Sequence, residues 1–98
     1  MSDEFGSAPP PFKADEALAM LKRHLRDMRL LERAGRFEWK GDPLVELTLE
    51  EGAIRARTVK RPARSPEWTV KLLRSAADVR HYTEDFKRQF ARWSDSDD

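Results

Sequence analysis

Basic side chains gather at two places along the chain, and phosphate binding is the chemistry that such clusters perform. From Ala53 to Ser65 the sequence holds five Lys and Arg residues and no acid. Upstream, four more basic residues follow at 4-, 3- and 4-residue steps, which places them along one side of a predicted helix. Lys and Arg bind nucleic acid by neutralising phosphates and releasing counterions. The candidate contacts for nucleic acid or an acidic partner are Lys22, Arg26, Arg29, Arg33, Arg55, Arg57, Lys60, Arg61 and Arg64.

The same residues also fit an ordinary solvated surface. Charged residues make up 38% of the chain, so basic stripes arise by chance, and Asp27 and Glu32 interrupt the helical stripe. Arg57 is expected to pair with Glu46 across a hairpin. The outer sheet face is expected to lack base-stacking aromatics, and the RNP signature of the RNA-recognition motif is absent. Nucleic-acid binding is therefore kept as the alternative hypothesis.

Catalytic and metal-binding patterns are missing from the sequence. There is no cysteine, and the two histidines, His24 and His81, are far apart. No Gly-x-Ser-x-Gly elbow, phosphate-cradling glycine loop or EF-hand spacing occurs. These observations predict a protein that is not an enzyme and that uses no metal or cofactor.

Two amphipathic helices are expected to flank the strands. The first should run from about Ala14 to Glu32, with Gly35 as its C-cap, because apolar residues recur there at 4- and 3-residue steps. The second should begin at Ser75, which forms a capping-box pattern with Asp78. Its apolar face consists of Val79, Tyr82, Phe86, Phe90 and Trp93.

Between the helices the apolar period changes to two, which predicts strands at 37–39, 45–49, 54–58 and 68–72. A two-residue turn at Glu51-Gly52 pairs residues whose numbers sum to 103, and this register gives one apolar face. For the preceding link, a three-residue loop at 41–43 places Phe37 and Trp39 in the core, whereas a two-residue loop at 41–42 places them outside. The first is preferred because Pro43 cannot donate a ladder hydrogen bond.

Two features point to protein contacts. The register above pairs Leu44 with Val59 on the outer sheet face, where an apolar patch would mark an interface. The edge strand at 68–72 could also accept a partner strand. We therefore expect a small interaction module that binds a protein partner or self-associates.

The predicted fold class is α+β, with an antiparallel α-β-β-β-β-α meander and both helices on one face. Residues 1–11 are expected to be a disordered leader, 12–93 the domain and 94–98 a disordered acidic tail. No signal peptide or membrane span is apparent, so the expected location is the cytoplasm. The layout is similar to that of the double-stranded-RNA-binding domain, which runs helix, three strands, helix. That family has a lysine cluster where this chain has Ser75-Ala-Ala-Asp78, so no site residues are carried over.

Overall fold

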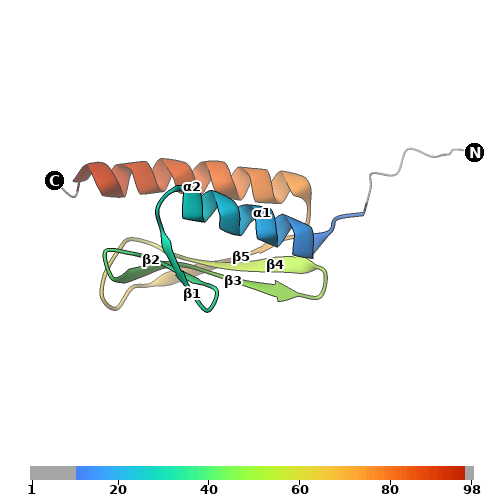
Figure 1. Cartoon of the computed structure of the whole chain (residues 1–98), viewed down its shortest axis with the longest axis horizontal. Coiled ribbons are helices and arrows are strands. Elements are labelled where there is room, and N and C mark those ends of the chain that lie inside the picture. The colour runs from blue at the N-terminus through green and yellow to red at the C-terminus, as the bar shows by residue number, and fades with distance from the viewer. Residues whose placement is uncertain (1–10, 97–98) are drawn as a thin grey trace, which may run out of the picture.

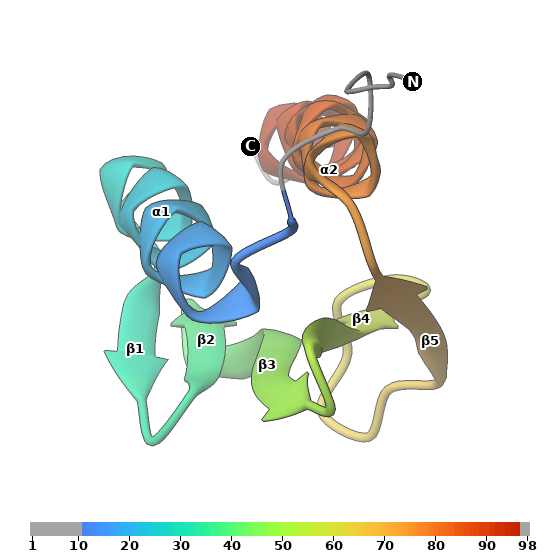
Figure 2. The ribbon, with the colours of Figure 1, turned by 90° about the vertical axis from the view of Figure 1, so that its right-hand side faces the viewer.

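The chain forms two layers, a five-stranded antiparallel sheet and two helices that lie together on one of its faces (Figures 1 and 2). A computed structural model describes residues 11–96. Its strands are ordered β1-β2-β3-β4-β5, a meander in which neighbours in sequence are neighbours in the sheet. The elements are α1 (Ala14–Asp27), β1 (Leu31–Arg33), β2 (Arg36–Trp39), β3 (Asp42–Glu50), β4 (Ala53–Val59), β5 (Trp68–Leu73) and α2 (Ala76–Ser96). The predicted fold class is confirmed, although the sheet has one strand more than expected.

Three tight turns connect the first four strands. Each turn has two residues, and the second is glycine: Ala34-Gly35, Lys40-Gly41 and Glu51-Gly52. Both residues of each turn have positive φ, for example 46° and 77° at Glu51-Gly52. This backbone conformation matches the right-handed twist of paired strands, and glycine adopts it without steric cost. The predicted turn at 51–52 is confirmed, and so is its register, which runs from Val45 opposite Thr58 to Leu49 opposite Ile54.

The first helix is shorter than predicted, because it ends at Asp27 rather than Glu32. Arg29 adopts a positive φ of 70°. The Leu30 N–H then bonds back to the Leu25 carbonyl (3.3 Å), as in a Schellman helix end, and Leu30 is buried. The chain turns here into β1. Gly35 is therefore not a helix cap but part of the β1–β2 turn.

The link between β2 and β3 also differs from both predicted registers. The turn is Lys40-Gly41, and Pro43 lies inside β3, opposite Glu38. The register shifts between Phe37 and Glu38, so Leu44 falls between two paired residues and has no β2 partner of its own. This β-bulge restores the expected orientation. Phe37 is fully buried, and the Trp39 ring lies 5.3 Å from that of Phe90 in α2.

The second helix supplies the aromatic part of the core. Its start is capped as predicted: the Asp78 N–H donates to the Ser75 hydroxyl (3.0 Å), and the Asp78 carboxylate accepts from the Arg74 N–H (2.9 Å). Tyr82 and Phe86 are buried, and the Phe86 ring packs against the neighbouring aromatic rings of α2. The helix continues through Ser96, three residues past the predicted domain end at 93. The predicted leader, apart from Pro11, and residues 97–98 lie outside the described residues.

Candidate interaction surfaces

The basic residues predicted along one stripe of the first helix do not form that stripe. Lys22 and Arg26 lie on α1 and pair with Glu32 of β1, at 3.4 and 2.8 Å. Arg29 lies in the turn after the helix. Arg33 lies in β1, where it pairs with Glu38 (3.6 Å). The prediction was wrong because it rested on a helix that continued past Asp27.

One member of the second basic group, Arg57, lies on the sheet face that the helices leave uncovered. Thr58 bonds to Tyr82 of α2, so its neighbour Arg57 faces away from the helices, by the alternation of a strand. Arg57 pairs with Glu46 as predicted (2.6 Å), and its guanidinium carbon lies 4.5 Å from the centre of the Trp68 ring. The outer sheet face was expected to lack aromatic residues, but it carries Trp68. One side of the Trp68 ring is covered by Arg57.

The remaining members of this group are spread along β4 and the loop that follows it. Arg55 lies on the same face as Arg57, and Lys60 pairs with Glu67 at 3.8 Å. Arg61 and Arg64 are exposed in the β4–β5 loop. The nine predicted contacts are thus divided between α1, the turn after it, β1, β4 and this loop. The structure does not bring them together into one basic surface.

The predicted protein interface at Leu44 and Val59 is wrong. Both side chains are buried, with exposures of 0% and 1%, and both belong to the hydrophobic core. Leu44 sits at the β2–β3 bulge, where the alternation of inward and outward side chains is interrupted. Val59 is paired with Trp68, which packs against the core cluster. Neither residue is available to a partner.

The edge strand predicted at 68–72 is present as β5. Its outward backbone groups follow from the ladder with β4, in which hydrogen-bonded and non-bonded pairs alternate. The Lys60 N–H donates to the Glu67 carbonyl (2.9 Å), so the next bonded pairs are Thr58 with Thr69 and Ala56 with Lys71. Three residues of β5 consequently turn their N–H and C=O groups away from β4, and these are Trp68, Val70 and Leu72. Among the described residues, no strand lies beyond them (Figure 2).

The other sheet edge, β1, is protected. It has only three residues, and its two-residue turn makes Arg33 and Arg36 a bonded pair, so Glu32 alone directs its backbone outward. The Glu32 side chain is held by Lys22 and Arg26. A short strand with a charged residue at its free position discourages further pairing. The two edges of the sheet therefore differ in their capacity to accept another strand.

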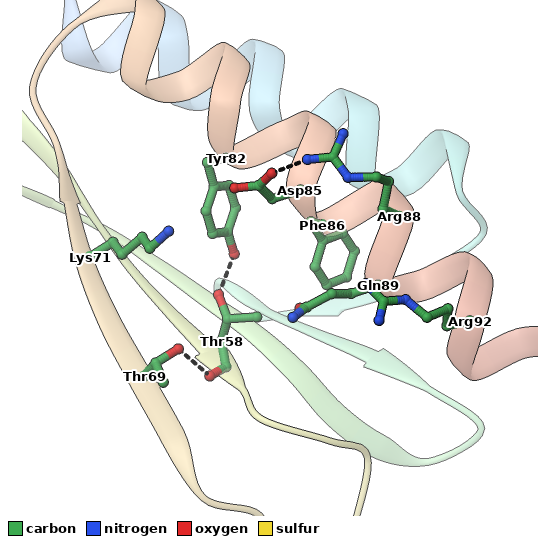
Figure 3. Close-up of a pocket in the computed structure, with 9 residues that line it drawn as sticks. All are labelled: Thr58, Thr69, Lys71, Tyr82, Asp85, Phe86, Arg88, Gln89 and Arg92. Atoms are coloured by element: carbon green, nitrogen blue, oxygen red, sulfur yellow. Dashed lines mark hydrogen bonds and ion pairs between the residues drawn. The ribbon is translucent and has the colours of Figure 1, made fainter.

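A hollow of about 320 Å³ lies between β5 and α2 (Figure 3). Lys71 and Arg88 line it beside Asp85, which pairs with Arg88. At its floor the Thr58 and Tyr82 hydroxyls bond to each other at 2.5 Å. Burial raises the pKa of Tyr82 to about 12, and the bond with Thr58 opposes part of this rise. This hydrogen-bonded pair links β4 to α2 at the bottom of the hollow.

A second hollow, of about 340 Å³, lies between α1 and α2 and is largely apolar. Met20, which is 57% exposed, lies at this groove, together with Ala17 and Val79. Within residues 11–96 we find no cluster of three or more His, Cys, Asp or Glu side chains that could hold a metal ion. Across the same residues, neither helix has the length and apolar character needed to cross a membrane.

Comparison of the chain with protein-family models, curated proteins and solved structures found no match. The functional argument therefore rests on the surfaces themselves.

Proposed function

We propose that this protein is a non-catalytic interaction module that binds a protein partner by pairing a partner strand with β5. The observation that carries the proposal is the free edge itself. The N–H and C=O groups of Trp68, Val70 and Leu72 point away from β4, and β5 is the last strand of the sheet in the described chain. Strand addition to such an edge uses main-chain hydrogen bonds for affinity.

The side chains at this edge support the same function. Val70 and Leu72 are 47% and 38% exposed, on the sheet face that the helices leave uncovered. Trp68 lies beside them, half-buried. Proteins usually protect a long edge strand with charges, prolines or a bulge. Lys71 is the one charged residue in β5, and its N–H and C=O groups face β4. Its charge therefore does not lie at one of the three positions whose N–H and C=O groups are free to pair.

Nucleic-acid binding is the weaker alternative. Four of the nine predicted contacts form no ion pair with another described residue, which favours it, and these are Arg29, Arg55, Arg61 and Arg64. However, five of the nine predicted contacts already pair with carboxylates of the described chain: Lys22, Arg26, Arg33, Arg57 and Lys60. A basic surface made by four dispersed arginines provides electrostatic attraction without a defined site. The expected setting for either function is the cytoplasm.

The proposal is tested by site-specific photo-crosslinking in the cells from which the protein comes. A photoreactive amino acid replaces Val70 in one variant and Leu31 in the other. Leu31 is a matched control, because it is an exposed apolar residue (57%) on the opposite edge strand. We expect protein adducts from position 70 and far fewer from position 31. Equal yields at both positions, or adducts with nucleic acid alone, would overturn the proposal.

A further inference from the structure

We infer that the partner strand is β5 of a second copy, so that two five-stranded sheets join into one continuous sheet with Val70 opposite Val70 of the second copy. This inference rests on the proposed function, since it names the occupant of the β5 edge. It follows from the backbone directions, the register and the charges of β5. Figure 2 shows that α2 lies over the sheet rather than beyond β5, so the helix leaves this edge open to a second sheet.

Backbone direction restricts the ways in which two β5 strands can pair. In an antiparallel ladder, residues directly opposite each other share a sheet face, and bonded residues must both direct their N–H and C=O groups across the gap. Only Trp68, Val70 and Leu72 have such groups. Pairings between odd- and even-numbered residues are therefore excluded. Twofold pairing about Trp68 or Leu72 sets Val70 opposite Pro66, which has no N–H, or Arg74, whose N–H is already used. Pairings about Thr69, Val70 and Lys71 remain to be compared.

Pairing about Lys71 is unfavourable for two reasons. It sets the two Lys71 residues directly opposite each other, and like charges in this position are destabilising. It also sets Trp68 opposite Arg74, whose N–H already donates to the Asp78 carboxylate at 2.9 Å. The free carbonyl of Trp68 would then lack a donor, because Arg74 lies in the capped start of α2.

Pairing about Thr69 is also incomplete. It sets Leu72 opposite Pro66, which has no N–H, and only Trp68–Val70 of the regular strand overlap. Pairing about Val70 uses all five residues from 68 to 72. Val70 then meets its own copy, and Trp68 meets Leu72. Every outward N–H and C=O of both strands acquires a partner in this register alone.

The side chains agree with the register about Val70. On the outer face, Trp68, Val70 and Leu72 of both copies form one apolar stripe across the junction. On the helix face, Lys71 lies opposite the Thr69 hydroxyl of the second copy rather than opposite another lysine. The contact is isologous, so it closes after two copies, whereas pairing β5 with β1 would be heterologous and could continue into a filament.

The chain contains no cysteine, so single-cysteine variants report the register directly. In the proposed register the two Val70 Cα atoms are about 5.5 Å apart, within the range for a disulfide. The Thr69 pair and the Lys71 pair are diagonal, at about 7–8 Å, beyond that range. We expect V70C to form the intermolecular disulfide about tenfold faster than T69C or K71C. Faster formation in either of the other two would overturn the register.

Sedimentation equilibrium tests the second copy itself. We expect a concentration-dependent mass that approaches twice the 11.4 kDa of one chain. Val70→Lys should raise the dissociation constant by about tenfold or more, because it places two charges on the twofold axis. Leu31→Lys is the matched control and should not change it. Circular dichroism checks that both variants are folded. If Val70→Lys does not fold, disulfide formation by V70C still tests the contact between two copies.

The failure of this inference can be distinguished from failure of the proposed function. A monomer at high concentration without a V70C disulfide would exclude the second copy. If position 70 still captures a different protein in cells, β5 remains the binding edge and only its occupant is wrong. If it captures no protein, both proposals are refuted.

Discussion

Removing the Tyr82 hydroxyl should change the stability of the protein in a way that depends on pH. This hydroxyl bonds to Thr58 at 2.5 Å beneath the hollow between β5 and α2, and it joins α2 to the sheet. Tyr82→Phe leaves the Thr58 hydroxyl without this partner. We expect the free energy of unfolding to fall by about 1–2 kcal/mol near neutral pH. Thr58→Val should have a similar effect, and the double variant should lose less than the sum by about 1 kcal/mol.

The pKa of Tyr82 determines what happens at alkaline pH. Burial raises it from 10.0 to about 12. Below pH 10 the phenol is protonated in the folded and unfolded states, so stability is unaffected by this group. Between pH 10 and about 12 the unfolded state loses a proton that the folded state keeps, and stability falls with rising pH. The loss in this interval is about 1.4 kcal/mol per pH unit.

Urea unfolding followed by circular dichroism measures these differences at neutral pH and in the alkaline interval. The two proteins share every other ionisable group, so the difference between wild type and Tyr82→Phe isolates the phenol. Tyr82 is the only tyrosine in the chain, and tyrosinate absorbance therefore follows this one group. The reasoning is refuted if the phenol titrates near pH 10 in the folded protein, or if Tyr82→Phe loses stability across the interval as steeply as wild type.

Two further changes test the α2 assignment. Phe86 is 2% exposed and packs among three other aromatic rings, so Phe86→Ala should lower the free energy of unfolding by about 3–5 kcal/mol. An unchanged urea midpoint would contradict its place in the core. Ser75→Ala removes the acceptor of the Asp78 N–H and should lower the free energy of unfolding by about 1 kcal/mol. An unchanged stability in thermal or urea unfolding would mean that the cap contributes nothing.

The parts of the fold that could be predicted were those where local signals and pairing agree. The turn at Glu51-Gly52 joins two alternating segments, and only one register gives an apolar face, so the β3–β4 hairpin followed directly. The second helix was equally clear, because a capping pattern precedes aromatic residues at helical spacing. These signals are local and do not depend on the rest of the chain.

The strand β1 was missed because its residues favour helices. The residues from Leu30 to Arg33 continue a helical pattern. The helix nevertheless ends at Asp27, and the chain turns away at Arg29, which has a positive φ of 70° although it is not a glycine. The sequence pattern therefore predicts a helix cap at Gly35, where the structure has a two-residue turn. Leu44 is buried at a bulge, and Val59 is buried beside Trp68 of the neighbouring strand β5. Neither contact can be predicted from the neighbouring residues in the sequence.

The most direct test of the β5 edge is amide hydrogen exchange of the unmodified protein, measured residue by residue at several concentrations. The N–H groups of Thr69 and Lys71 bond to β4 and should exchange slowly at every concentration. Those of Trp68, Val70 and Leu72 should exchange rapidly in dilute solution and become protected as the concentration rises. The Glu32 N–H on the other edge should stay unprotected throughout. Protection at Trp68, Val70 and Leu72 that does not change with concentration would contradict pairing between two copies of β5.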